Sequence, residues 1–486
     1  MQFATCRVSL LKRLKLLLVL GFLVVSAPEA IHAQTSFVRI SVLALGPARI
    51  RVELNTPGNT EWSFRNTYTS VVGLADRIQN FHGKDHLGRE VPGRKLAPGE
   101  YRFPEKVTNV SYDVLLHPPA RLANLSHVSW LNKEHGLLML GDLLPATGMA
   151  VESLLNLNLV LPPGWTSASS QNSKREQYVV SRPEQAVFLV GSSLRKKRVR
   201  VGTSEIGIAT VGEWSFSDSE LRKIVVKIVE EYTRVLAHAP PANVALLLVP
   251  FSDAVGPEQW TAETRGQNVV LLMGRLGKSR ALLARLKVVL AHELFHLWIP
   301  NSLKLQGDYD WFFEGFTLYQ ALLTGLRLRY ITFENFLETL SRVYGSYRSS
   351  TERDKLSLLD ASERRWTAAS SLVYDKGALV AFIYDLMLRQ SVRRDTFSDI
   401  YPEVLQTGQE NRQDANQLLI KLLDKRKGME RFSERFVQST AEIDLASVLA
   451  PFGLEVADMG SSSRIQVSRN INKEQRQLLR TLGYKK

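Results

Sequence analysis

The chain has 486 residues, 44% of them hydrophobic and 23% charged, and its formal net charge is +14. This composition excludes an intrinsically disordered protein, and the length allows several domains that each bury a core. The basic excess is compatible with nucleic acid, an anionic envelope surface or acidic substrates, so charge alone does not select a partner. The only cysteine is Cys6, so the cores must hold the fold without an internal disulfide.

The first 33 residues are organised like a secretory signal peptide. Basic residues from Arg7 to Lys15 precede the apolar run Leu16–Val25, and Ile31-His32-Ala33 offers a cleavage site before Gln34. This run is shorter than the ~20 residues that a helix needs to span a bilayer. We therefore expect a secreted or periplasmic protein with no stable transmembrane anchor after signal removal. An uncleaved membrane anchor is the alternative.

Residues 34–200 have the pattern of a β-rich domain. Apolar and other residues alternate from Val38 to Val42, and the turn pair Gly46-Pro47 follows. Further strands are expected over residues 107–116, 137–140 and 155–161. Five histidines occur here without the spacing of metal ligands and are interpreted as loop or surface residues: His82, His86, His117, His127 and His135.

The densest basic cluster runs from Arg195 to Arg200. At its end, charged residues alternate with Val199 and Val201. We therefore interpret the cluster as the solvent-exposed face of a strand rather than a binding patch. A secreted destination also argues against a nucleic acid as partner. The expected partner is therefore a peptide or protein substrate, for the reasons given next.

The pattern changes from β to mixed after Trp214. Ser217 and Glu220 have the spacing of a capping box, which predicts a helix that continues to about His238. The runs Val244–Val249 and Asn268–Met273 are apolar throughout and predict two buried strands.

The segment His292-Glu293-Leu294-Phe295-His296 carries the chemistry. On a helix, His292 and His296 lie one turn apart on the same face, so their two imidazoles can bind one metal ion. Nitrogen ligands in this arrangement suit Zn²⁺. Glu293 is placed to take a proton from an attacking water. A catalytic zinc needs a third protein ligand and one open position.

Glu314 is our candidate for the third ligand. It begins an apolar segment that predicts a second helix to Leu326, and the residues before His292 predict a mostly buried first helix. We therefore expect one Zn²⁺ per chain, held by His292, His296 and Glu314. Two satisfied histidines in an ordinary protein core are the alternative.

These residues resemble the gluzincin metallopeptidases. The segment Trp311-Phe312-Phe313-Glu314-Gly315-Phe316-Thr317 is similar to the sequence around their third ligand, and Tyr374-Asp375-Lys376-Gly377-Ala378-Leu379 resembles a segment of the glycyl aminopeptidase family. The leukotriene-A4-hydrolase-like aminopeptidases are related. The resemblance covers about residues 240–450. The glycyl family usually ends in a PDZ domain, which we do not expect in the residues after Pro451.

The resemblance implies a thermolysin-like catalytic fold and a role for Tyr374. In that fold, the last strand before the metal helix is the edge that pairs with an extended substrate. Tyr374 would donate a hydrogen bond to the oxyanion that forms during hydrolysis. Without the resemblance, Tyr374 would be interpreted as a core tyrosine.

The sequence departs from the family where aminopeptidases bind the free α-ammonium of their substrates. The expected position, about 25 residues before His292, falls on Gly266 and Gln267, and Gln267 is neutral. Glu258 could substitute, although its neighbours fit poorly. Because a buried ammonium needs a carboxylate partner, we expect a weak demand for a free N-terminus and either aminopeptidase or mixed exo- and endopeptidase activity.

We therefore predict an α+β multidomain hydrolase, a secreted zinc metalloprotease of aminopeptidase type. Its expected parts are a signal peptide (1–33), a β-rich N-terminal domain (34–200), a thermolysin-like catalytic domain (201–345), a helical domain (346–450) and a C-terminal tail (451–486). The alternative function is a catalytically weak or inactive binding or scaffold protein of the cell envelope on the same fold.

Overall fold

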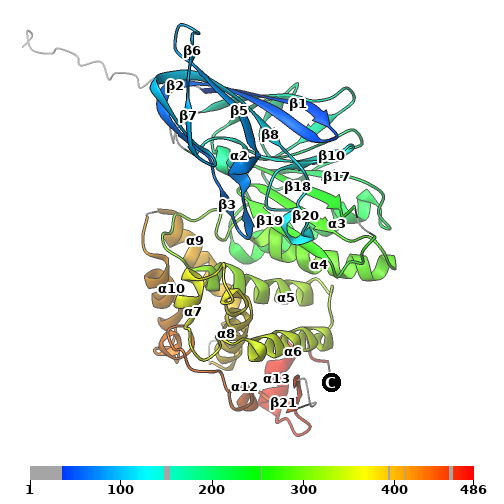
Figure 1. The fold of residues 1–486 in the computed structure, drawn as a ribbon. Helices are drawn as coiled ribbons and strands as arrows, with labels where there is room; N and C mark the ends of the chain where they lie inside the picture. The colour runs from blue at the N-terminus through cyan, green and yellow to red at the C-terminus, as the bar shows by residue number, and fades with distance from the viewer. Residues whose placement is uncertain are drawn as a thin grey trace, which may run out of the picture.

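A computed structural model describes residues 36–146, 154–252, 254–391, 395–410, 412–458 and 463–485. The expected signal peptide lies outside these residues. Three parts follow one another down Figure 1: strands in blue and cyan, a sheet with helices in green, and helices in yellow to red. The predicted α+β multidomain architecture is confirmed. Within the residues that the structure describes, every helix is too short or too polar to cross a membrane.

The N-terminal part is organised around three long antiparallel strands, β1 (Ser36–Leu45), β2 (Ala48–Ser63) and β8 (Glu100–Leu115). Val38 and Ile40 are buried on one face of β1, while Phe37 and Arg39 face solvent, as the alternation predicted. The strand order is β13-β14-β11-β1-β2-β8-β5-β6, with β7 also beside β8. The other strands are β5 (Ile78–Lys84), β6 (Glu90–Val91), β7 (Arg94–Ala97), β11 (Leu155–Val160), β13 (Ser173–Lys174) and β14 (Gln177–Val180).

A smaller sheet and a hairpin connect this part to the rest. The sheet has the order β12 (Thr166–Ala168), β15 (Val187–Gly191), β10 (His135–Met139) and β9 (Trp130–Leu131), and the short helix α2 (Leu140–Leu143) follows β10. The hairpin consists of β3 (Thr67–Tyr68) and β4 (Val71–Val72). In Figure 1, β3 reaches down from the N-terminal sheet to strand β19 of the next part.

The five-stranded sheet of the middle part has the order β16 (Arg195–Val201), β17 (Ser204–Thr210), β18 (Asn243–Pro250), β20 (Asn268–Met273) and β19 (Trp260–Arg265). Side chains of β18 and β20 are buried on both faces. Leu246 and Leu248 pack on one side with the helices, whereas Leu247 and Val249 pack on the other side with the small sheet. Double coverage explains why these strands are apolar throughout.

The edge of this sheet differs from the prediction. The last strand before the metal helix, β20, was expected at the edge, but it lies between β18 and β19. The edge is β19, which pairs antiparallel with β20 and was not predicted. Its sequence Trp-Thr-Ala-Glu-Thr-Arg lacks an apolar alternation because several of its side chains line a polar cavity, described below. The basic cluster forms the opposite edge strand, β16, with mainly exposed side chains.

Two helices cover one face of the sheet, α3 (Asp218–Leu236) and α4 (Ser279–Phe295). The predicted capping box opens α3: Ser217 Oγ accepts from the Glu220 amide at 3.2 Å, and the Glu220 carboxylate accepts from the Ser217 amide at 2.8 Å. The lower part contains α5 (Thr317–Arg327), α6 (Phe333–Ser349), α7 (Leu358–Glu363), α8 (Ser370–Gln390), α9 (Tyr401–Glu410), α10 (Ala415–Asp424), α11 (Phe432–Phe436) and α12 (Leu445–Leu449).

Residues 451–486 contain more regular structure than the expected tail. β21 (Leu454–Asp458) and β22 (Ser463–Val467) form a hairpin, and α13 (Lys473–Thr481) follows. The Ile465 amide donates to Ser341 Oγ on α6 at 2.8 Å, which holds the hairpin to the helical part. The expected domain boundaries at 200 and 345 fall inside β16 and α6, because strand pairing and helix length are set by tertiary packing that composition does not reveal.

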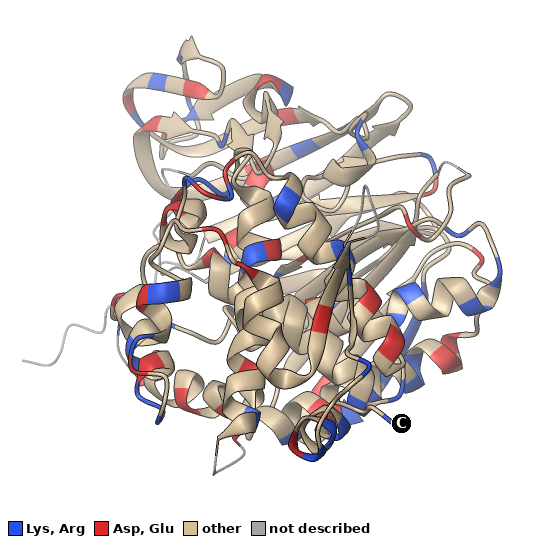
Figure 2. Ribbon diagram, turned by 90° about the horizontal axis from the view of Figure 1, so that it is seen from below, with Lys and Arg blue, Asp and Glu red and all other residues tan. Residues whose placement is uncertain are grey.

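Charged side chains are interspersed over the outer helices. In the view of Figure 2, Lys and Arg alternate with Asp and Glu along the helices rather than forming one face of a single sign. Positive charge of the described residues is therefore spread over the surface in this view. This distribution gives no support to an extended nucleic-acid surface.

Candidate active site

His292 and His296 lie at the C-terminal end of α4. Leu286, Leu290 and Leu294 of the same helix are buried and anchor it in the core. The Nε2 atoms of the two histidines are 3.1 Å apart. His296 Nδ1 donates to the Ile299 carbonyl at 2.9 Å, so Nε2 carries the lone pair that faces His292. The backbone after the helix thus fixes the tautomer that a metal ligand requires.

Glu314 completes the group from the next helical segment. Its Oε2 is 3.2 Å from His292 Nε2 and 3.5 Å from His296 Nε2. Residues Trp311–Phe316 form a turn of π-helix that continues into α5, and π-turns are frequent at functional sites. The three predicted ligands are therefore brought together in space, although Glu314 follows His296 by 18 positions in the chain.

Two glycines allow this segment to approach α8 closely. A Cβ on Gly315 would lie 2.5 Å from the Val373 carbonyl oxygen and 2.6 Å from Gly377 Cα. A Cβ on Gly377 would lie 2.9 Å from Gly315 Cα. The glycine-to-glycine contact is the physical reason for Glu-Gly-Phe in one motif and Lys-Gly-Ala in the other, since it places Glu314 next to Tyr374.

The donor set fits a zinc ion. Two imidazole nitrogens and one carboxylate oxygen converge, and a cation satisfies their three lone pairs at once. Burial would raise the pKa of the Glu314 carboxyl, but His296 and Arg365 outweigh it and hold the pKa well below its usual value. Glu314 is therefore ionised, as a ligand must be.

Glu293 is buried beside the two histidines and is oriented by a neighbour that the sequence analysis missed. Thr264 on β19 places its hydroxyl 2.9 Å from Glu293 Oε2 and 2.8 Å from the Glu293 carbonyl oxygen. Thr264 on the edge strand therefore helps to orient the carboxylate of Glu293, the general-base candidate. No sequence signal marked Thr264, because β19 itself was not recognised.

Tyr374 lies on α8 with its ring centroid 6.5 Å from that of His292. Its phenol oxygen accepts a hydrogen bond from Arg365 Nη2 at 3.1 Å. Burial, and then the charge of Glu314, raise the pKa of Tyr374 well above its usual value, so the phenol stays protonated. Arg365 also donates to Glu314 Oε1 at 2.7 Å and pairs with Asp310. Arg365 was missed because it belongs to no motif.

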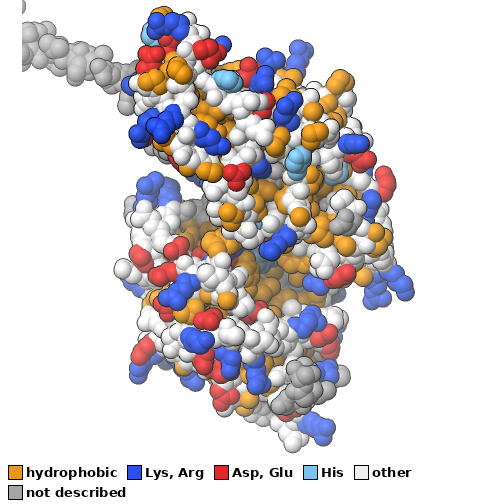
Figure 3. Space-filling view, in the orientation of Figure 1, with side chains coloured by type: hydrophobic (Ala, Val, Ile, Leu, Met, Phe, Trp, Pro, Cys, Tyr) orange, Lys and Arg blue, Asp and Glu red, His pale blue; other side chains and the backbone are white. Residues whose placement is uncertain are grey.

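The three candidate ligands line one cavity of about 410 Å³ together with Glu293, Thr264, Arg365 and Tyr374. The space-filling view is hollowed between the N-terminal part and the helical part, and hydrophobic side chains gather along the hollow (Figure 3). The lining residues include Tyr68, Thr69 and His127 from the N-terminal part, Trp260 to Thr264 from β19, and Phe313, Arg365 and Trp366 beside the metal ligands. His127 was interpreted as a loop or surface residue, and its loop lines this cavity.

The structure does not bring the three predicted substrate-binding residues to the metal ligands. Gly266 and Gln267 form the turn between β19 and β20 and line a separate cavity of about 520 Å³. Glu258 precedes β19 and is absent from the described lining of the metal cavity. The carboxylate of β19 that does line the metal cavity is Glu263, because the chain between the edge strand and the helix is longer than the family spacing implied.

Residues 285–380 match the M61 glycyl aminopeptidase family. The matched segment contains all three candidate metal ligands and Tyr374. The chain is a zinc metallopeptidase that resembles the gluzincin aminopeptidases. Comparison with curated proteins gives no match. The resemblance inferred from the two motifs is therefore confirmed, and zinc is its cofactor.

Solved structures with a similar fold include an aminopeptidase N family protein and an M1 zinc metallopeptidase. An aminopeptidase N family protein from Idiomarina loihiensis superposes with a TM-score of 0.74 at 19% identity, over 87% of this chain and 79% of that chain. An M1 zinc metallopeptidase from Deinococcus radiodurans gives a TM-score of 0.52 at 13% identity, over 85% and 95%. At these identities the comparisons show the fold of this zinc metallopeptidase.

Proposed function

We propose that the protein is a secreted peptidase that hydrolyses peptide bonds with Glu293 as general base and Tyr374 as oxyanion donor. The observation that carries the proposal is the convergence of His292, His296, Glu314, Glu293 and Tyr374 on one cavity. His292, His296 and Glu314 would hold the zinc, which when bound would supply the Lewis acidity needed to activate water and polarise the scissile carbonyl. The substrate is a peptide or protein.

Glu293 takes the proton of the attacking water and later delivers it to the leaving amine. The Thr264 hydroxyl contacts the Glu293 carboxylate at Oε2. In this proposal the other carboxylate oxygen accepts the proton of the reacting water. Both transfers then use one carboxylate in one orientation. Burial of Glu293 protects this proton from exchange with bulk solvent.

Tyr374 stabilises the negative charge that develops on the carbonyl oxygen. Arg365 donates to the phenol oxygen, so the phenol proton points away from Arg365, and in this proposal it is donated to the substrate. Removing one such donor costs about 10²–10³ in rate. The edge strand β19 offers its backbone to an extended substrate, in the mode of β-strand addition.

Secretion rests on residues 1–33, which have a basic start, an apolar run and a small-residue exit. N-terminal sequencing of the protein recovered from the periplasm or the medium should begin at Gln34. A protein that retains Met1 and stays with the membrane would overturn this part of the proposal.

The test of the enzymatic proposal is to measure metal content and hydrolysis of a mixed peptide library on one purified sample. We expect about one zinc per chain and hydrolysis that a chelator abolishes and added zinc restores. Full zinc occupancy without hydrolysis of any peptide would instead favour the scaffold alternative.

A further inference from the structure

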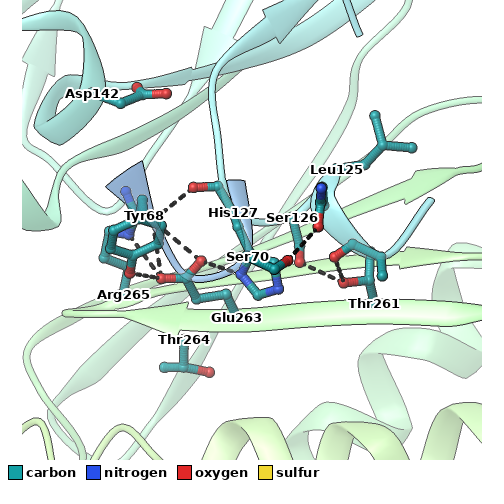
Figure 4. A network of polar contacts seen from close by, with 12 residues as sticks. Tyr68, Ser70, Leu125, Ser126, His127, Asp142, Thr261, Glu263, Thr264 and Arg265 are labelled. Atoms are coloured by element: carbon teal, nitrogen blue, oxygen red, sulfur yellow. Dashed lines mark hydrogen bonds and ion pairs between the residues drawn. The ribbon is translucent and has the colours of Figure 1, made fainter. Parts of the chain in front are cut away.

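Glu263, the carboxylate of the edge strand, is enclosed by polar partners (Figure 4). Its Oε1 accepts from the Tyr68 hydroxyl and from Arg265 Nε at 3.0 Å. Its Oε2 lies 2.7 Å from His127 Nδ1 and 3.2 Å from Arg265 Nη2. Both oxygens therefore already make two contacts each, close to the capacity of a carboxylate.

The charge of Glu263 is compensated within the protein. Arg265 is only 6% exposed and forms a bidentate pair with Glu263, while its Nη2 also donates to the His127 carbonyl at 3.0 Å. Burial would raise the pKa of Glu263, but Arg265 and then His127 outweigh it, so the pKa lies below its usual value. Burial and the Glu263 charge raise the pKa of Tyr68 to about 12, so its hydroxyl remains a donor.

The N-terminal part holds this arrangement in place. Tyr68 comes from β3 and His127 from the loop after the 3₁₀ turn Leu122–Asn124. In that loop, Ser126 Oγ lies 2.7 Å from Thr261 Oγ1, which donates to the Ala123 carbonyl at 2.8 Å. The Arg265 guanidinium also lies 4.4 Å from the centre of the Tyr68 ring. The β-rich part therefore builds one wall of the catalytic cavity and fixes Glu263 from both sides.

A free substrate ammonium that enters the cavity finds no uncompensated carboxylate. Among the described lining residues the acidic ones are Glu263, Glu293 and Glu314. Glu293 serves as base and Glu314 as ligand, which leaves Glu263. An ammonium at Glu263 would have to displace Arg265, Tyr68 or His127, and a buried cation without its own counter-charge is strongly disfavoured.

We propose that the β19 end of the cavity binds an uncharged amide or acyl group, so that the substrates are peptides cleaved at internal bonds or carrying an acylated N-terminus. This inference rests on the proposed peptidase function. Amide groups of an extended chain need no counter-charge and can pair with the backbone of an edge strand. From the sequence, a weak demand for a free N-terminus was expected because Gln267 is neutral. The structure gives another reason: the carboxylate of Glu263 is present in the cavity, but Arg265 compensates its charge.

The first test compares each peptide of the library with its N-acetylated form on the zinc-loaded enzyme. We expect kcat/KM values for the two forms that agree within about threefold. A loss of about a hundredfold or more on acetylation would show that the enzyme requires a free amine and would overturn the inference. If neither form is cleaved, the proposed peptidase function itself is refuted, and this inference falls with it.

The second test removes the cation that compensates the Glu263 carboxylate. In Arg265→Gln, the Glu263 carboxylate loses its compensating cation, so we expect the preference to shift toward the free-amine peptide by about tenfold in kcat/KM ratio. The matched control is Arg342→Gln, which removes the same charge from an exposed pair with Glu338 on α6 and should leave the ratio as in the wild type. An unchanged ratio in a folded Arg265→Gln protein would contradict the charge argument.

If Arg265→Gln does not fold, the double variant Glu263→Gln/Arg265→Gln removes both charges together and leaves neither a cation nor a carboxylate uncompensated. Gln at position 263 keeps an acceptor for the Tyr68 hydroxyl. The proposal predicts that the acetylated-to-free ratio stays at its wild-type value. A strong rise in KM for the free-amine peptide alone would identify Glu263 as an ammonium anchor and overturn the inference.

Discussion

The guanidinium of Arg365 donates one hydrogen bond to the phenol oxygen of Tyr374 at 3.1 Å. The same Nη2 donates to Glu314 Oε1 at 2.7 Å, so Oε2 of Glu314 is left to face the two histidines. One largely buried cation therefore orients both Tyr374, the proposed oxyanion donor, and Glu314, the proposed third ligand. The phenol oxygen of Tyr374 already accepts this hydrogen bond, so the phenol proton points away from Arg365. A substrate in the cavity can supply an acceptor for that proton.

Tyr374→Phe should lower kcat by about 10²–10³ with little change in KM, because the hydroxyl is used in the transition state. Steady-state kinetics on the best library peptide measures both parameters. The ring stays in place in this variant, so zinc content should remain at the wild-type level. An unchanged kcat would return Tyr374 to the role of a core tyrosine.

Arg365→Met should weaken zinc binding as well as lower kcat, because the position of Glu314 loses its support. We expect a rise of about tenfold in the zinc dissociation constant, in the range found for residues that orient metal ligands. Competition with a chromogenic chelator measures this constant without any substrate. Arg365→Lys keeps the charge and should recover part of the affinity but not the double hydrogen bond. Wild-type zinc affinity in Arg365→Met would show that the contact is incidental.

Each single substitution His292→Ala, His296→Ala and Glu314→Ala should lower zinc occupancy sharply, because three ligands act together as a chelate. Metal analysis after dialysis measures the occupancy, and circular dichroism checks that the fold persists. The cores consist of many buried apolar side chains that do not depend on the metal, so helix content should be retained. Full occupancy in Glu314→Ala would remove that residue as the third ligand.

Glu293→Gln should keep zinc and fold but lose nearly all hydrolysis, since Gln cannot accept the water proton. Thr264→Val tests the residue that orients it and should lower kcat by about tenfold. Thr264→Ser retains the hydroxyl and serves as the matched control. Turnover near the wild-type rate in Glu293→Gln would rule out the general-base role.

The sequence predicted the parts of the site that depend on local spacing. His292, Glu293 and His296 lie on one helical turn, so their relation follows from the 3.6-residue period. Strands β1, β18 and β20 were likewise recognised from burial patterns that a single strand carries. These features need no knowledge of the rest of the chain.

The missed features depend on contacts between distant segments. No local pattern marks Arg365, Thr264 or the Tyr68–Glu263–His127 group. Thr264 and the Tyr68–Glu263–His127 group contact partners that lie 29 to 195 positions away in the chain. Arg365 is nine positions from Tyr374, but this spacing belongs to no motif. Strand β19 was missed since an edge strand that lines a polar cavity shows no apolar alternation. Counting residues back from His292 failed to find the cavity-lining carboxylate because hairpin and loop lengths vary without changing the fold.

Gly315→Ala tests the close contact that brings the two motifs together. The added Cβ would lie 2.5 Å from the Val373 carbonyl oxygen, and backbone atoms on a buried helix cannot move aside as a flexible side chain can. We expect a loss of about 1–3 kcal/mol or more in the free energy of unfolding, together with reduced zinc affinity, because Glu314 is the neighbouring residue. Gly345→Ala on α6 is the matched control: its Cβ would meet no atom within 4 Å, so the higher helix propensity of alanine should stabilise the protein by about 0.5–1 kcal/mol. Denaturant unfolding compares the two variants, and a Gly315→Ala protein as stable as Gly345→Ala would show that α8 can shift without cost.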